Sequence, residues 1–512
     1  MIATPSSLLV AQLTSMAPDH RLRNAAIRIL LFLVTFAGLC SGAFGQKLNV
    51  GIQVLPGAPG RLLIQVSGPP QSTWSFSDSY AGVLGLGNRI RGFQAFDSDE
   101  REFAVRKIAP GEFASAEPGV KFKYEIELAP PARSSDAALI SWLDSERGVL
   151  LLSDLLPALK VARTANAKVK VSAQFALPAG WTSYSPEAQG DQGQIETTDI
   201  ERTTIAVGKK LHRSTRTIVN KTFALVTDEG WAFADDDALD TVADVLKVHS
   251  ELGQLPCESP ALILLPLPQA SSANKWSAQT RGCTVTLLMG KSPSKVSALS
   301  QLGLALTHEL FHLWVPNGLA LGGDYDWFYE GFTMYEAARA AMRLDLLTFQ
   351  QLLNAIADAH DGSSGANAQD LSLIEASKQR WTGGSSSVYS KAMVVAFLYD
   401  LNLRYQTKGK RSLDYVYRKI FREHLGKPNS STTESDGNGV VVAGLREELS
   451  TPEFVDHFVI ARSVIDLSKE LVPFGLHVEK PALRTHIYVN EQLTGRQRDL
   501  LRQLGYNEPR PR

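Results

Sequence analysis

The stretch Thr307-His308-Glu309-Leu310-Phe311-His312 determines how the rest of this 512-residue chain is interpreted. It lies in a run of apolar residues at helical spacing that Pro316 ends, so we expect a helix with the motif in its middle. Residues four apart on a helix lie one above the other, and the rings of His308 and His312 can therefore reach one metal ion. Glu309 lies about 100° further round, where its carboxylate can reach water on the metal without ligating the metal itself. The alternative is a pair of histidines on a helix surface.

A third candidate ligand, Glu330, follows 18 positions after His312, within Trp327-Phe328-Tyr329-Glu330-Gly331-Phe332-Thr333 at the start of the next predicted helix. A carboxylate among aromatic residues is costly to bury unless something positive pairs with it. A catalytic zinc ion needs three protein ligands and one open position. The sequence therefore predicts one zinc ion per chain, held by His308, His312 and Glu330. The alternative for Glu330 is a glutamate that interacts with the dipole at a helix start.

The two motifs, H-E-L-F-H-L-W at 308–314 and W-F-Y-E-G-F-T-M-Y at 327–335, resemble the gluzincin clan of zinc metallopeptidases. Within the clan they are most similar to the glycyl aminopeptidase family, and next to the leukotriene-hydrolase and aminopeptidase N families. Weaker similarity covers most of the chain after residue 45, at 177–181, 373–377, Trp381, 389–391, 409–414 and 474–476. The resemblance implies zinc-dependent hydrolysis of peptide bonds in peptide or protein substrates, as an aminopeptidase, with Glu309 as the general base.

The resemblance also implies an α+β architecture: an N-terminal all-β domain, a thermolysin-like zinc catalytic domain and a C-terminal α-helical domain. The order of elements agrees with it, because short alternating runs before residue 217 predict strands and the pattern after residue 292 is mostly helical. We place the three domains at 46–217, 218–345 and 346–485. Residues 1–45 are expected to form a signal peptide and residues 486–512 a tail.

The resemblance implies a catalytic role for Tyr389 as well, since the Y-x-K-G segment of the family places a tyrosine hydroxyl against the tetrahedral intermediate. A phenol donor at that place stabilises the developing oxyanion by a few kcal/mol. Here Ala392 stands where the family has glycine. The alternative is a tyrosine that packs a helix.

Two departures from the family pattern leave the aminopeptidase activity open. The family has a Gly-Gly-Leu-Glu-His-like strand before the zinc helix, whose glutamate holds the free α-amine of the substrate. The comparable stretch of this chain is expected at 281–286, which contains no acidic residue. The PDZ module common at the C-terminus of the family is also not expected here, because only 26 residues follow His486. The missing strand acid and the altered segment around Tyr389 support an alternative function, a catalytically inactive binding module on a metallopeptidase scaffold, and endopeptidase action stays open.

Charge and the N-terminal pattern narrow the partners and the location. Lys and Arg total 52 against 53 for Asp and Glu, so no basic field is available to gather nucleic acid. Arg21, Arg23 and Arg28 precede an apolar run at 29–39 and a small-residue stretch at 41–45. This order is typical of a secretory signal cleaved after Gly45, and the run is shorter than the ~20 residues of a membrane-spanning helix. We expect a secreted or periplasmic protein without a stable membrane span.

Cleavage of the signal removes Cys40 and leaves Cys257 and Cys283, each beside a short apolar run that predicts a strand. Two cysteines in an oxidising compartment are expected to form a disulfide bond, here between neighbouring strands. The alternative is two buried free thiols. Asp324 and Asp326, which precede the Glu330 helix, are expected to be turn and N-cap residues and not ligands.

Overall fold

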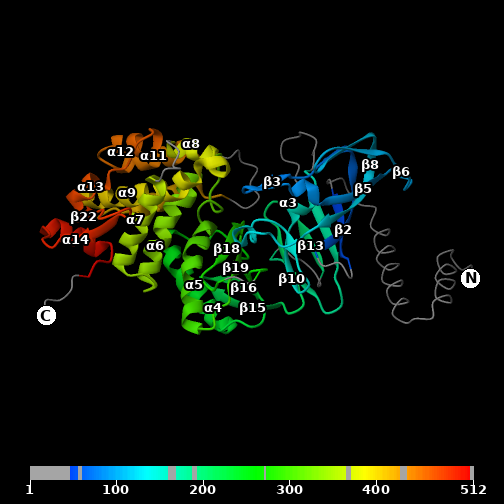
Figure 1. Cartoon of the computed structure of the whole chain (residues 1–512), viewed down its shortest axis with the longest axis horizontal. Coiled ribbons are helices and arrows are strands. Elements are labelled where there is room, and N and C mark those ends of the chain that lie inside the picture. The colour runs from blue at the N-terminus through cyan, green and yellow to red at the C-terminus, as the bar shows by residue number, and fades with distance from the viewer. Residues whose placement is uncertain are drawn as a thin grey trace, which may run out of the picture. The chain divides into compact units, whose positions relative to one another are not determined.

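The computed structural model describes residues 47–55, 60–158, 169–186, 193–269, 272–364, 371–426 and 435–507, which Figure 1 draws in colour. The signal peptide predicted at 1–45 lies outside these residues and stays a prediction. Within the described ranges, every helix is too short or too polar to cross a membrane.

The first part of the described chain contains two main sheets that share one core. The larger sheet has the order β13-β11-β1-β2-β8-β5-β6, with β7 paired to β8. Its strands are β1 (Lys47–Val54), β2 (Arg61–Ser75), β5 (Ile90–Phe96), β6 (Glu102–Phe103), β7 (Val105–Ala109), β8 (Glu112–Glu127), β11 (Lys170–Ala176) and β13 (Gln194–Thr197). Alternate residues of β1 and β2 point to opposite faces, so Leu48, Val50, Ile52, Leu62, Ile64 and Val66 are buried on one of them. The predicted all-β domain is confirmed.

The smaller sheet has the order β12-β14-β10-β9, and its central strands β10 and β14 are buried on both faces. Its strands are β9 (Trp142–Leu143), β10 (Arg147–Leu151), β12 (Thr182–Tyr184) and β14 (Thr204–Gly208). Leu150 of β10 joins the core of the larger sheet, whereas Val149 and Leu151 join a core with Ile263 and Leu265 of the next sheet along the chain. This two-sided burial explains why β10 is a continuous apolar run and not an alternating one.

That next sheet is mixed, and the helix with the zinc motif, His308 to His312, packs on it. Its order is β15-β16-β17-β19-β18, in which β16, β17 and β19 are parallel and β18 is an antiparallel edge strand. The strands are β15 (His212–Ile218), β16 (Lys221–Thr227), β17 (Ala261–Pro266), β18 (Trp276–Arg281) and β19 (Thr284–Met289), and the helices α4 (Asp235–His249) and α5 (Lys295–Glu309) pack on it. Because β15 pairs with β16, the mixed sheet starts before residue 218, where we placed the domain boundary.

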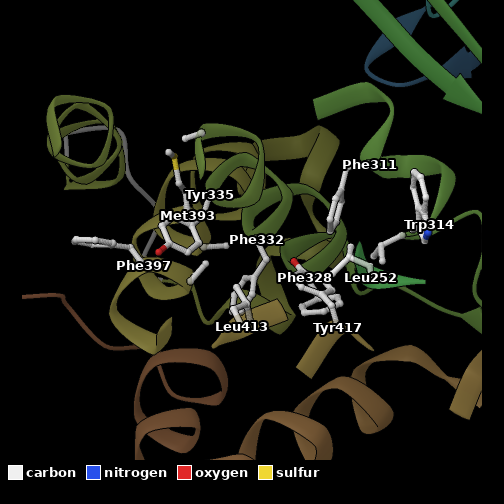
Figure 2. Close-up of a cluster of buried hydrophobic side chains, with 14 of the residues drawn as sticks. Leu252, Phe311, Trp314, Phe328, Phe332, Tyr335, Met393, Phe397, Leu413 and Tyr417 are labelled. Atoms are coloured by element: carbon white, nitrogen blue, oxygen red, sulfur yellow. The ribbon is translucent and has the colours of Figure 1, made fainter. Parts of the chain in front are cut away.

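The remaining elements are mainly helical and share one core with α4 and α5. They include η5 (Trp327–Phe332), α6 (Thr333–Arg343), α7 (Phe349–Ser364), α8 (Leu373–Lys378), η6 (Arg380–Gly384), η7 (Ser387–Lys391), α9 (Ala392–Thr407), α10 (Leu413–His424) and α11 (Gly437–Glu448). Figure 2 shows part of this core, where the Tyr417 ring of α10 lies near both Phe311, inside the motif at 307–312, and Phe328 of η5. The predicted three-part α+β architecture is present, but the predicted catalytic and helical parts share one hydrophobic core and do not have separate cores.

The segment predicted as a tail contains regular structure. β23 (His486–Val489) pairs with β22 (Leu476–Glu479), and α14 (Gly495–Gln503) buries Leu500 and Leu501. Thr494 caps α14 by accepting a hydrogen bond from the Gln497 N–H, while the Gln497 side chain accepts from the Thr494 N–H. This capping box is a helix-start signal that the sequence interpretation overlooked.

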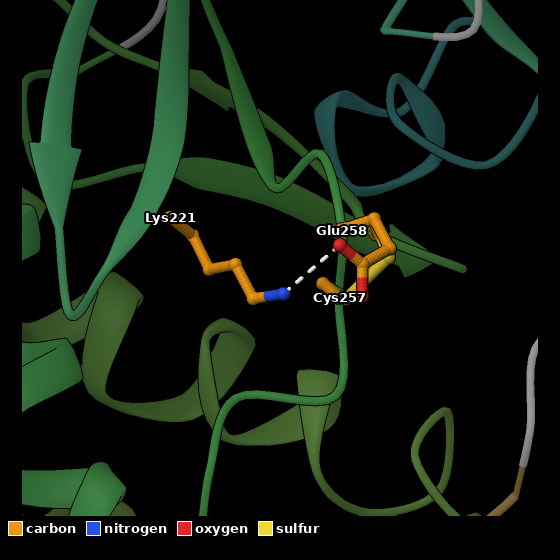
Figure 3. The surroundings of a disulfide bond; sticks show 4 residues. Lys221, Cys257 and Glu258 are labelled. Carbon is orange, nitrogen blue, oxygen red and sulfur yellow. Dashed lines mark hydrogen bonds and ion pairs between the residues drawn. A yellow bond between two sulfur atoms is a disulfide. The ribbon is translucent and has the colours of Figure 1, made fainter.

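The predicted disulfide bond between Cys257 and Cys283 is present, with the Cα atoms 5.6 Å apart. It joins the loop before β17 to the turn between β18 and β19. Figure 3 shows the neighbouring ion pair between Lys221 and Glu258, whose Nζ and Oε2 atoms are 3.0 Å apart. The loop before β17 is therefore linked to the β18–β19 turn by the disulfide bond and to β16 by the ion pair.

Replacing both cysteines by serine should lower the free energy of unfolding by about 2–4 kcal/mol, because the bridge closes a loop across a sequence separation of 26 residues. Urea denaturation with and without reductant measures the effect. Reductant should destabilise the wild type and leave the double variant unchanged. Two titratable thiols in the unfolded, unreduced wild type would contradict the bond.

Candidate metal centre

The zinc motif lies at the C-terminal end of α5, not in the middle of a helix as predicted. α5 starts at the Ser294 cap, whose hydroxyl accepts from the Ser297 N–H, and ends at Glu309. A tighter turn, η4 (Phe311–Leu313), follows directly. Leu310 and Trp314 keep right-handed helical backbone angles, so the path through the motif stays helical. The rings of His308 and His312 consequently lie on the same side, as the spacing predicts.

The structure brings His308, His312 and Glu330 together. One ligand atom from each lies within 4.8 Å of the other two, and all three side chains are buried. The two Nε2 atoms are 3.0 Å apart, and Glu330 Oε2 lies 3.4 Å from His308 Nε2 and 3.6 Å from His312 Nε2. His312 Nδ1 donates to the Val315 carbonyl oxygen at 2.9 Å, which leaves its Nε2 with a lone pair for a metal.

The charges at this point suit a divalent cation. Burial by itself disfavours a carboxylate, but the two histidines and Arg380 hold the pKa of Glu330 well below its usual value. Burial also disfavours a charged His312, yet Glu330 raises its pKa above the ordinary value. The negative charge of Glu330 thus draws positive charge to the place where two imidazole nitrogens converge. Two nitrogens and one carboxylate oxygen match the donor set of a catalytic zinc site.

Glu330 lies in η5, a widened, π-type turn of a kind that is frequent at functional sites. Gly331 lets this turn approach the helical region closely. A Cβ atom on Gly331 would lie 2.3 Å from Ala392 Cβ and 2.4 Å from the Val388 carbonyl oxygen, so no larger residue fits. The metal ligand and the segment around Tyr389 are therefore pressed together.

Glu309 is held from the edge strand of the mixed sheet. Thr280 of β18 donates its hydroxyl proton to Glu309 Oε2 at 2.8 Å, and the same hydroxyl lies 2.9 Å from the Glu309 carbonyl oxygen. The sequence interpretation missed Thr280, because it took 281–286 as the comparable strand. That stretch contains the last residue of β18, the turn after it and the first half of β19. β18 itself, Trp276–Arg281, also contains no acidic residue.

Arg380 is the other residue that the sequence interpretation missed. Its Nη2 donates to Glu330 Oε1 at 2.8 Å and to the Tyr389 hydroxyl, and its Nη1 donates to Asp326 Oδ1 at 2.8 Å. Tyr389 therefore lies beside the predicted metal ligands, and its own catalytic role stays a prediction. Asp326 immediately precedes η5, but its side chain makes no cap hydrogen bond there and binds Arg380 instead.

A hairpin of the β domain also reaches this region. It consists of β3 (Ser79–Tyr80) and β4 (Val83–Leu84), and the Tyr80 ring lies 4.7 Å from the Arg281 guanidinium at the end of β18. Gly82 at its tip lies against Trp381, next to Arg380. The hairpin thus contacts the residues that directly follow Thr280 and Arg380 in the chain.

Comparison with known proteins supports the fold. The chain is similar to an aminopeptidase N family protein from Idiomarina loihiensis, with a TM-score of 0.70 and 17% identity over 85% of this chain and 79% of that one. It is also similar to a mutant M1 zinc metallopeptidase from Deinococcus radiodurans bound to a Tyr-Ser-Ala substrate, with a TM-score of 0.51 and 13% identity over 83% and 96% of the two chains. Neither a family model nor a curated protein matches the sequence. The protein has the fold of gluzincin zinc metallopeptidases of the M1, aminopeptidase N type.

Metal-free protein should take up one zinc ion per chain. His312→Ala removes a ligand and should weaken the affinity for zinc by more than ~100-fold, because losing only a residue that hydrogen-bonds to a ligand already costs up to that much. Competition with a chromophoric chelator measures the affinity. His360→Ala is the matched control, since His360 lies on a different helix, α7, and its Nε2 atom bonds the Ile465 carbonyl oxygen. Equal affinities in the two variants would contradict the site.

His249 of α4 contacts the helix that carries the motif, and burial lowers the pKa of His249 from 6.5 to about 4. Its Nε2 lies 3.0 Å from the carbonyl oxygen of Thr307, the residue before His308. Between pH 6.5 and 4 the unfolded chain binds a proton at His249 that the folded chain does not, so stability falls as the pH falls. The loss from this group should reach about 3 kcal/mol at pH 4.

Denaturant unfolding of wild type and His249→Gln between pH 7 and pH 4 checks this value. Glutamine keeps a donor for the Thr307 carbonyl oxygen but does not titrate, so the stability of the variant should depend less steeply on pH. His457→Gln, at an exposed histidine, should follow the wild type. Parallel curves for wild type and His249→Gln would show that His249 stays solvated.

Proposed function

We propose that this protein is a zinc-dependent peptidase and, within that class, an aminopeptidase. The observation that carries the proposal is the convergence of His308, His312 and Glu330 beside the buried carboxylate of Glu309. A bound zinc ion would polarise the scissile carbonyl group and lower the pKa of a water molecule to around 7. The two histidines and Glu330 would hold that ion, with one position open to water and substrate.

Glu309 is proposed as the general base. Its Oε2 is engaged by Thr280, which fixes the carboxylate plane and leaves Oε1 for the attacking water. Glu309 takes the proton of this water and delivers it to the leaving amine. Tyr389 is proposed to donate its hydroxyl proton in a hydrogen bond to the carbonyl oxygen as negative charge develops there.

The aminopeptidase part of the proposal rests on the similar structures, one of which carries the name aminopeptidase N and another a bound tripeptide substrate. No residue of β18 is an acid that could hold a substrate α-amine in the manner expected of the family. The inactive binding module is less well supported, because Thr280 still orients a carboxylate that a module without catalysis has no use for.

We also propose that the protein acts outside the cytoplasm, as a secreted or periplasmic enzyme. The N-terminal pattern at 1–45 supports this location. The disulfide bond between Cys257 and Cys283 agrees with it, because such bonds persist mainly in oxidising compartments.

Glu309→Gln should reduce peptide hydrolysis by at least ~10²-fold, the usual scale for losing a general base, while zinc content stays at one ion per chain. Glutamine still accepts the Thr280 hydrogen bond, so the change removes the base and little else. Cleavage of a mixed peptide library, followed by mass spectrometry, measures activity and distinguishes removal of N-terminal residues from internal cleavage.

Glu375→Gln is the matched control, because Glu375 forms an ion pair with Arg462 at the surface and should leave hydrolysis unchanged. Equal hydrolysis by wild type and Glu309→Gln would rule out the proposed mechanism. A wild type that holds zinc and cleaves no peptide would favour the binding module.

A further inference from the structure

We infer that Arg380 is a positioning residue of the metal centre, which holds one oxygen of Glu330 away from the metal and directs the Tyr389 hydroxyl proton toward the substrate. The inference rests on the proposed function. Neither the zinc motif nor the resemblance of the sequence assigns a role to Arg380.

The guanidinium group has a fixed place. The Arg380 side chain is 11% exposed, and its guanidinium carbon lies near two aromatic rings, 4.3 Å from the centre of Trp381 and 5.1 Å from the centre of Tyr389. Hydrogen bonds from its two terminal nitrogens fix the rotation of the planar group. Arginine suits this arrangement because its rigid fork presents donors in set directions, which the single ammonium group of lysine does not.

The two oxygens of Glu330 point to different partners. Oε1 accepts from Arg380 at 2.8 Å, whereas Oε2 faces the histidine nitrogens at 3.4 and 3.6 Å. With Oε1 engaged, Oε2 alone is presented at the point where the three ligands converge. Partners that orient a metal ligand in this way commonly contribute 10- to 100-fold to metal affinity.

A buried cation so near a metal site would repel the metal unless its charge were balanced. Asp326 balances it, with its Oδ1 2.8 Å from Arg380 Nη1 and its side chain buried. The pair Arg380–Asp326 is neutral as a whole, so the negative charge of Glu330 remains available to a metal ion. This explains why Asp326 binds Arg380 instead of capping η5.

Arg380 also determines the direction of the Tyr389 hydroxyl. A guanidinium group only donates hydrogen bonds, so the Tyr389 oxygen must be the acceptor in their contact. The proton of that hydroxyl is then directed elsewhere, and no described residue accepts it. Because the same Nη2 atom binds Glu330 Oε1, the hydroxyl is fixed close to a metal ligand, where a substrate oxygen can receive the proton.

A double-mutant cycle with Arg380→Gln, Tyr389→Phe and the combined variant tests the inference. At saturating zinc, each single change should lower kcat by about 10²-fold, with KM changed by less than about threefold. The combined variant should be no slower than the slower single variant, because Arg380 acts through Tyr389. A combined loss equal to the product of the two single losses would overturn this part of the inference.

Zinc affinity is the second measurement, and it needs no activity. Chelator competition should show a 10- to 100-fold weaker zinc affinity in Arg380→Gln and an unchanged affinity in Tyr389→Phe. Unchanged affinity in Arg380→Gln would overturn the role toward Glu330. Arg462→Gln, at the surface ion pair with Glu375, is the matched control and should behave as wild type in both measurements.

Two further comparisons distinguish a failure of the inference from a variant that does not fold and from a failure of the proposed function. If Arg380→Gln does not fold, Arg380→Lys retains the charge without the fork and should still lower kcat and zinc affinity. A folded Arg380→Lys with wild-type values would overturn the inference. If the wild type binds zinc but cleaves no peptide, the proposed function fails, while the zinc measurement still decides whether Arg380 holds Glu330.

Discussion

The buried carboxylate of Glu330 is the group on which the rest of the site depends. Such a group is tolerated only if positive charge and hydrogen-bond donors surround it, and they come from two places in the chain. The zinc motif supplies two imidazoles, and Arg380 supplies the guanidinium. The widened turn η5, the small Gly331 and the ion pair with Asp326 all serve to bring these groups to one point.

Local spacing explains which parts of this arrangement could be predicted from the sequence. His308 and His312 are four residues apart, and a helix alone is enough to bring them together. Thr280 and Arg380 are different, because they meet Glu309 and Glu330 across 29 and 50 residues, and no periodic pattern connects residues at such separations. Only the pairing of β18 at the sheet edge and the packing of α8 and η7, which flank η6, against η5 bring them into contact.

The same reasoning applies to the fold. Alternation in β1 and β2 and the apolar run of β17 predict strands, and the separation into β and helical parts follows from them. The domain boundaries could not be predicted in this way. β15 and β23 belong to their sheets because they pair with β16 and β22, and their own composition does not indicate it. The shared core around Phe311, Phe328 and Tyr417 likewise depends on contacts between distant segments.

The close contact at Gly331 has a consequence for how the sequence of this protein can change over generations. A side chain on Gly331 would strike both a backbone oxygen and Ala392, so descendants that keep the fold are confined to glycine there. Ala392 meets only a hydrogen from that direction and can lose its methyl group without a clash. Related sequences should therefore have either alanine or glycine at position 392 and always glycine at position 331. Another residue at position 331 would indicate a relative that has lost the metal centre.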